Sequence, residues 1–153
     1  MLSNIDRVKV AAYRLLMASV YELAAVSRRE SEAFARQQNV TVAQWHTMSV
    51  LSDGHAATVP QIAARLGVTR QAVQRVADQL LDSGRVEGVS NPRHETSPLL
   101  RLTPAGQDVL TTLWEVSEAP RAEMLAEIDT TRISEANSTI KALISGLQRG
   151  GSQ

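Results

Sequence analysis

The chain has 153 residues, of which 43% are hydrophobic, and its 16 lysines and arginines balance 16 aspartates and glutamates. This length favours one domain, or a small domain with extensions, and the apolar share is enough for a core. There is no run of 18 apolar residues and no basic stretch followed by an apolar one, so we expect neither a membrane span nor a secretory signal. Cysteine is absent, which excludes a thiol redox switch and fits a reducing compartment, here the cytoplasm.

The zero net charge conceals a segregation along the chain. Three arginines and no acids lie between Arg65 and Arg75, whereas six acids and two arginines lie between Glu115 and Glu135. A local basic cluster can bind nucleic acid even where the global charge is zero. Composition therefore does not exclude a nucleic-acid partner.

Residues 5–37 are predicted to form one long helix. They contain neither glycine nor proline, and apolar or small residues recur every three to four positions: Ile5, Val8, Ala12, Leu15, Ser19, Leu23 and Val26. Such a helix is roughly 50 Å long, too long for a small domain to bury. The pattern indicates a partner helix, and we assign residues 1–40 to dimerisation.

A second helix is predicted to begin after Thr41. Thr41 and Gln44 have the spacing of a capping box, and Val40 is placed to pack on Trp45 as a hydrophobic staple. This helix should end near residues 53–54, Asp-Gly.

Residues 58–77 are predicted to form a helix-turn-helix. Thr58 and Gln61 have capping-box spacing, and Pro60 lies in the first turn, where its missing N–H costs little. Gly67 can end the first helix in a left-handed conformation, and Thr69 can cap the second helix.

Packing of the second helix on the first, through Ala63, Val68 and Val73, would present its polar face to a DNA groove. That face comprises Arg70, Gln71, Gln74 and Arg75. The alternative is an ordinary helical hairpin whose polar face is merely solvated.

Two short runs, 85–90 and 98–102, have strand character and flank a turn-rich stretch, so they predict a small β-hairpin. A helix should begin at Thr103 and Pro104, and Pro120 should kink or break it. Asp129 is placed to cap a last helix, whose apolar stripe is Ile133, Ile140, Leu143, Ile144 and Leu147. The fold class is therefore mainly α with a small β-wing, a winged helix-turn-helix between outer helices.

In the order and spacing of these segments the chain resembles the MarR-type transcriptional regulators. The carrying residues are 41–45 (TVAQW), 59–69 (VPQIAARLGVT), Val73, Val76, Gln79, Leu80, Gly84 and 102–106 (LTPAG). The resemblance implies a winged helix-turn-helix at 41–103, dimerisation helices at 104–153 and 1–40, and a homodimer on palindromic double-stranded DNA. It also implies a repressor released by a small apolar or phenolic ligand between these regions.

The predicted wing departs from this family's pattern. Aligned back from Leu102 and Thr103, the family's Asp-Arg-Arg run falls on His94, Glu95 and Thr96, and Gly88 stands where the family often has an arginine. The neighbouring Arg93 is the candidate replacement for the minor-groove arginine. The predicted DNA-binding residues are Thr69, Arg70, Gln71, Gln74, Arg75 and Arg93.

A ligand cleft is expected where the first, second and fifth helices meet. Tyr13, Trp45 and Trp114 could give it aromatic walls, and His46 a polar handle. The alternatives are core or interface packing for the aromatic residues and a half-buried structural role for His46.

No arrangement typical of an enzyme or a metal site stands out. The three histidines, His46, His55 and His94, lack metal-ligand spacing, and we expect no metal and no cofactor. Neither a Ser-His-Asp pattern nor a glycine-rich phosphate loop is present. The function that the sequence favours is DNA-binding regulation, with a winged-helix protein–protein interaction module as the alternative.

Overall fold

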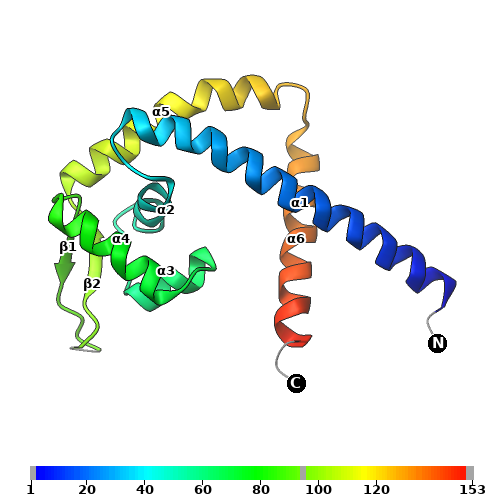
Figure 1. Cartoon of the computed structure of the whole chain (residues 1–153), viewed down its shortest axis with the longest axis horizontal. Coiled ribbons are helices and arrows are strands. Elements are labelled where there is room, and N and C mark those ends of the chain that lie inside the picture. The colour runs from blue at the N-terminus through cyan, green and yellow to red at the C-terminus, as the bar shows by residue number, and fades with distance from the viewer. Residues whose placement is uncertain (1–2, 94–95, 151–153) are drawn as a thin grey trace. The chain divides into compact units, whose positions relative to one another are not determined.

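The computed structural model describes residues 3–93 and 96–150, in two compact units that meet between Val116 and Ser117. The described residues form six helices and one antiparallel pair of strands, ordered as in Figure 1. Each unit is described by itself. The mainly α fold with a small β-wing is the one predicted.

Helices α1 (Asn4–Gln37) and α2 (Val42–Val50) both begin at a capping box, which was predicted for α2. Thr41 Oγ1 accepts from the Gln44 N–H at 3.1 Å, and Gln44 Oε1 accepts from the Thr41 N–H at 3.0 Å. Helix α1 begins the same way, with Ser3 and Asp6. The predicted long helix and the second start signal are confirmed, because a capping box needs only residues three apart.

The helix-turn-helix consists of α3 (Val59–Leu66) and α4 (Arg70–Asp82). Thr58 and Gln61 form the predicted capping box, and Gly67 ends α3 with φ at 66°. A residue with a Cβ is strained in this left-handed conformation, which explains why glycine occupies position 67. Figure 1 shows α3 and α4 crossing in the green part of the chain.

The wing consists of β1 (Val86–Val89) and β2 (Leu99–Leu102). Glu87 lies opposite Arg101, whose guanidinium donates to Glu87 Oε1 at 2.5 and 3.1 Å. Ala57, just before α3, exchanges both backbone hydrogen bonds with Leu100. The wing is thereby joined to the start of the helix-turn-helix.

Helix α5 (Pro104–Leu125) leaves the wing through a tight corner. The Thr103 hydroxyl donates to the Gly84 carbonyl at 2.6 Å and accepts from the Gly106 N–H at 3.1 Å. A Cβ built on Gly106 would lie far closer to the Arg85 carbonyl oxygen than two such atoms can approach. Glycine at 106 therefore lets α5 pass directly over the backbone that follows α4.

Pro120 does not break α5, which continues to Leu125. Of the two outcomes predicted for this proline, the break is wrong. Pro120 removes the helical donor of the Val116 carbonyl, and the helix tolerates the loss of this one bond.

One apolar core lies within the first unit. It is formed by the end of α1, by α2, α3, α4 and the wing, and by the first half of α5, where Leu110 and Leu113 are fully buried. Most of α1 stays outside it: Leu15 is 73% exposed and Leu23 66%. By length and composition alone α1 could cross a membrane, but its apolar stripe equally suits a helix–helix interface.

The second unit holds the end of α5 and α6 (Thr130–Gly150). Asp129 Oδ1 accepts from the Thr131 N–H at 2.7 Å, which confirms the predicted cap. None of the α6 residues is buried, and Ile133, Ile144 and Leu147 are all exposed. This apolar stripe therefore has no cover from its own unit.

Candidate nucleic-acid interface

Helix α4 presents a polar face to solvent because its apolar residues anchor the opposite face. Val73 is 2% exposed, and Ala77 and Leu80 are fully buried in the core. The four residues predicted to contact DNA from this helix are all exposed: Arg70, Gln71, Gln74 and Arg75. The geometry fits the predicted recognition helix, with donors and acceptors that suit base edges and phosphates.

Thr69 is exposed at the start of α4 and acts in the structure as its N-cap. Its Oγ1 accepts from the Ala72 N–H at 3.1 Å. This bond satisfies one of the helix's unpaired amides and leaves the hydroxyl hydrogen as a donor toward a phosphate.

Two side-chain bonds join α4 and the residue after its turn, Arg85, to the segments that precede the helix-turn-helix. Gln44 Nε2 donates to Gln79 Oε1 at 3.1 Å, and Arg85 Nη1 donates to the Asn39 carbonyl at 3.3 Å. Gln44 thus both caps α2 and joins it to α4. The recognition helix is fixed by polar bonds in addition to its buried face.

A groove of about 430 Å³ separates α4 from the wing. Arg70, Gln71 and Gln74 line it on the helix side, and Thr96 and Pro98 on the wing side. The exposed face of α4 and the wing thus line one common groove.

A second hollow, of about 550 Å³, lies between the wing and the start of α3, and the exposed Arg93 lines it. The Arg93 N–H donates to Asn91 Oδ1 at 3.1 Å, and Asn91 Nδ2 donates to the Ser97 carbonyl at 2.8 Å. Asn91 is only 9% exposed, so it braces the loop from inside. His94 and Glu95 lie outside the described residues.

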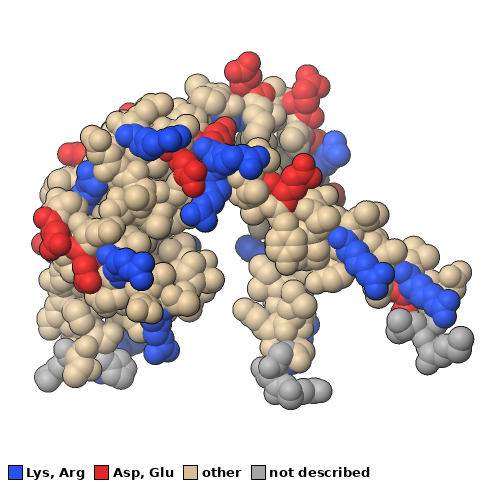
Figure 2. Space-filling model, in the orientation of Figure 1, with Lys and Arg blue, Asp and Glu red and all other residues tan. Residues whose placement is uncertain are grey.

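The charge on this region is mixed. Figure 2 shows basic and acidic side chains next to one another over the winged helix. On α4 the arginines belong to the first half, whereas Asp78 and Asp82 belong to the second half. The positive charge is thus concentrated at the end of the helix whose residues usually contact base edges in helix-turn-helix proteins.

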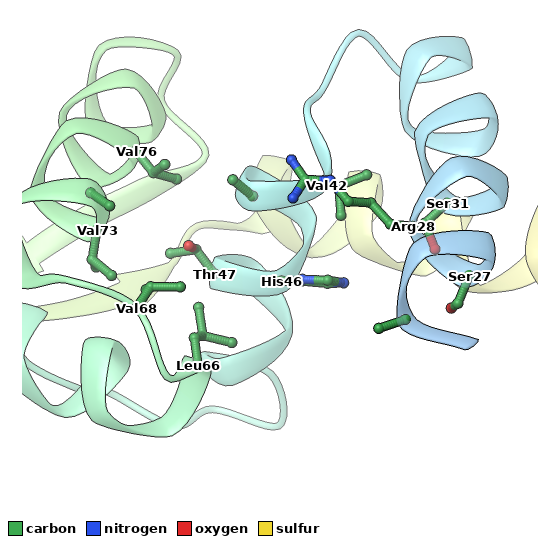
Figure 3. Close-up of a pocket in the computed structure, with 13 residues that line it drawn as sticks. Ser27, Arg28, Ser31, Val42, His46, Thr47, Leu66, Val68, Val73 and Val76 are labelled. Atoms are coloured by element: carbon green, nitrogen blue, oxygen red, sulfur yellow. The ribbon is translucent and has the colours of Figure 1, made fainter. Parts of the chain in front are cut away.

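A pocket of about 430 Å³ lies between α1, α2 and the helix-turn-helix (Figure 3). His46 extends from α2 toward α1, whereas Thr47 extends toward Val68 and Val73. The inner residues of α4, Val73 among them, form one wall. A molecule in this pocket would touch the recognition helix from behind.

The pocket differs from the predicted aromatic cleft in its position and in its lining residues. Of the four predicted residues only His46 lines it, because Trp45 points into the core at 4% exposure and Tyr13 and Trp114 lie elsewhere in the unit. Its walls are aliphatic and small side chains, with polar groups from α1 that the sequence analysis missed: Ser27, Arg28 and Ser31. The sequence feature that could have identified these residues is the polar run 27–31, which interrupts the apolar stripe of α1.

Among residues 3–93 and 96–150 there is no group of three or more acidic or histidine side chains that could hold a metal ion.

Comparison with known proteins identifies the family of the winged helix-turn-helix region. Residues 38–95 match the model of the MarR family. Proteins of Mycobacterium bovis and of Mycobacterium tuberculosis H37Rv, both described as uncharacterized, are 41% identical over 133 residues, which is 87% of this chain and 92% of theirs.

Solved structures show the same fold. A MarR family transcription regulator has a TM-score of 0.76 at 22% identity and matches over 99% of both chains. A mutant of Escherichia coli MarR, complexed with operator DNA, has a TM-score of 0.71 at 18% identity over 92% of this chain and 99% of its own. Residues 38–95 of this chain thus belong to the MarR family, and the chain has the fold of that family's winged helix-turn-helix transcription regulators.

Proposed function

We propose that this protein is a homodimeric cytoplasmic repressor that binds a palindromic operator and releases it when a small ligand binds. The observation that carries the proposal is the continuous surface formed by the polar face of α4 and the wing groove. Side chains of this kind, on a helix narrow enough for the major groove, suit direct base recognition.

The dimer is supported by apolar surface that one chain leaves uncovered. Leu15 and Leu23 on α1 are each more than 60% exposed, and α6 has no buried residue. Stripes of this length on terminal helices are typical of helix–helix interfaces. Two recognition helices in such a dimer would lie about 34–36 Å apart on DNA, one helical turn.

Release by a ligand is supported by the position of the pocket behind α4. A ligand shifts an equilibrium only if it binds one state better than the other. Because Val73 and Val76 form part of the pocket wall, a ligand there would favour a different position of α4. The aliphatic walls together with His46 and Arg28 suit a small molecule with an apolar body and a polar or acidic end.

A mobility-shift titration tests DNA binding. The probe is a duplex selected by the purified protein from a randomised pool, measured at several salt concentrations. We expect tight binding that weakens steeply with salt, because arginine–phosphate contacts release counterions.

The second candidate is a protein–protein interaction module, favoured by the zero net charge and by the acids next to the arginines. The selection from the randomised pool separates the two. If no sequence is enriched and binding at physiological salt is undetectable, the interaction module replaces the repressor.

Ligand release has its own test. Benzoate and its hydroxylated and alkylated derivatives are titrated while tryptophan fluorescence and affinity for the selected duplex are followed. The repressor hypothesis predicts that some compounds bind saturably to the wild type and lower its affinity for DNA. Ala24→Trp fills the pocket from the exposed side of α1, so the same compounds should leave the DNA affinity of this variant unchanged. If every compound that binds leaves DNA affinity unchanged, the protein is a constitutive DNA binder.

A further inference from the structure

The exposed face of the recognition helix carries an acid, which is unfavourable beside DNA. Asp78 lies one turn after Gln74 and one turn before Asp82, in the exposed part of α4. A carboxylate there repels phosphates and weakens binding to any sequence. A residue with this cost calls for a physical role.

The contact that Asp78 makes indicates that role. Gln74 Nε2 donates to Asp78 Oδ1 at 2.8 Å. Because a carboxylate only accepts hydrogen bonds, the Asp78 side chain holds Nε2 of Gln74 toward itself. The flipped orientation, with Gln74 Oε1 facing the carboxylate, is excluded. Gln74 also lines the groove between α4 and the wing, so its side chain is held at the proposed DNA surface.

We propose that Asp78 is a specificity-determining positioning residue, which orients the Gln74 amide for recognition of one adenine. The inference rests on the proposed DNA-binding function and names how that surface selects sequence.

The chemistry of the amide supports adenine. An amide has two N–H groups and one carbonyl oxygen. With one N–H given to Asp78, one N–H and Oε1 remain, and adenine offers the complementary N7 acceptor and N6 donor in the major groove. Guanine offers two acceptors there, O6 and N7, so an oriented Oε1 would face an acceptor and reject it.

A helix-stabilising role alone is the competing explanation, because Gln–Asp pairs four residues apart stabilise helices slightly. The two explanations differ in what Asp78→Ala does to DNA. A stabilising pair would change helix stability and leave base preference intact. An orienting pair would relax the preference at one base pair while overall affinity is kept or increased.

The experiment compares the wild type with Gln74→Ala, Asp78→Ala and the charge-matched control Asp82→Ala. The wild type first selects its preferred duplex from the randomised pool. The affinity of each protein is then measured for this duplex and for its single-base variants. Circular dichroism verifies that each variant is folded.

For Gln74→Ala we expect discrimination at one A·T pair to fall about tenfold, within the range of one bidentate contact. Asp78→Ala should lose most of the discrimination at the same base pair. The double variant Gln74→Ala/Asp78→Ala should lose no more discrimination than Gln74→Ala alone. Both Asp78→Ala and Asp82→Ala should bind unrelated DNA more tightly, by about two- to threefold at low salt, because each removes a negative charge.

The inference is overturned if Asp78→Ala keeps the wild-type preference and behaves like Asp82→Ala. It is also overturned if Gln74→Ala changes no base preference. These results leave the proposed function intact, whereas a wild type that enriches no sequence overturns the proposed function and this inference together.

Discussion

At the residue scale, the side chains of α4 divide into three kinds of contact. Val73 and Leu80 anchor the helix in the core, and Thr69 caps it. Arg70, Gln71 and Arg75 are exposed and can contact a partner. Because these roles alternate along one helix, a single substitution can separate binding from folding.

Arg70→Ala and Arg75→Ala should weaken DNA binding while the protein stays folded, since both side chains are exposed. An arginine that contacts a phosphate should lower affinity for all sequences and reduce the salt slope by about one, whereas one that contacts a base should cost about 1–3 kcal/mol at one position. Mobility shifts at several salt concentrations distinguish the two. If both variants, together with Gln71→Ala and Gln74→Ala, bind like wild type, α4 is not the recognition helix.

Gly106→Ala should destabilise the fold although alanine is a better helix former than glycine. The new Cβ would collide with the Arg85 carbonyl, and such overpacking costs about 1–3 kcal/mol. Gly146→Ala is the matched control, because Gly146 also lies in a helix and its Cβ would meet no atom within 4 Å. It should increase stability by about 1 kcal/mol. Urea denaturation at one protein concentration measures both, and equal shifts of the same sign would contradict the packing argument.

At the element scale, the wing is a small sheet held at three points. The strands pair with each other, Ala57 pairs with Leu100, and Asn91 braces the loop. The wing can therefore keep a defined position beside α4. Its charge, in contrast, differs from the pattern implied by the family resemblance, which leaves Arg93 as the exposed cation near the described tip.

Arg93→Ala should weaken binding to all duplexes by a similar factor and reduce the salt slope by about one, as expected for the loss of one phosphate or minor-groove contact. Arg101→Ala is the control, because its guanidinium is already paired with Glu87 across the wing. The same mobility-shift series measures both variants. Equal losses would show that the wing contributes through its general charge, and no loss with Arg93→Ala would exclude it as the replacement arginine.

At the scale of the whole molecule, the proposed dimer rests on the apolar faces of α1 and α6. On α1, Leu15 is 73% exposed and Leu23 66%. Two copies that bury these faces would also supply two recognition helices, one for each half-site of a palindromic operator.

Sedimentation should therefore show a dimer at micromolar concentration. Leu15→Glu and Leu23→Glu should raise the dimer dissociation constant by about 100-fold or more, because each loses the burial of a leucine and adds a charge to an apolar interface. DNA affinity should fall in parallel. Ala64→Glu on α3 controls for added charge and should leave the dimer unchanged. A wild type that sediments as a monomer would refute the dimer.

Most of the fold could be predicted from the sequence because its signals are local. A capping box acts over three residues, a glycine turn over one, and an amphipathic stripe over four. These signals correctly placed α2, α3, α4 and the wing in chain order, although α2 ends at Val50, before the predicted Asp53-Gly54. Pro120 is the exception, because α5 tolerates the one hydrogen bond that this proline removes and continues to Leu125.

The site required the tertiary structure wherever it depended on distant segments. Trp45 and His46 are adjacent in sequence, yet helix geometry turns Trp45 into the core and His46 into the pocket. The crossing of α1 and α2 brings Ser27 and Arg28 to that pocket, and the return of α5 makes Gly106 necessary against Arg85. The sequence alone determined which elements form and which faces are polar, because those depend on neighbours along one chain segment. The tertiary structure decided which side chains meet, because that depends on how separate elements pack.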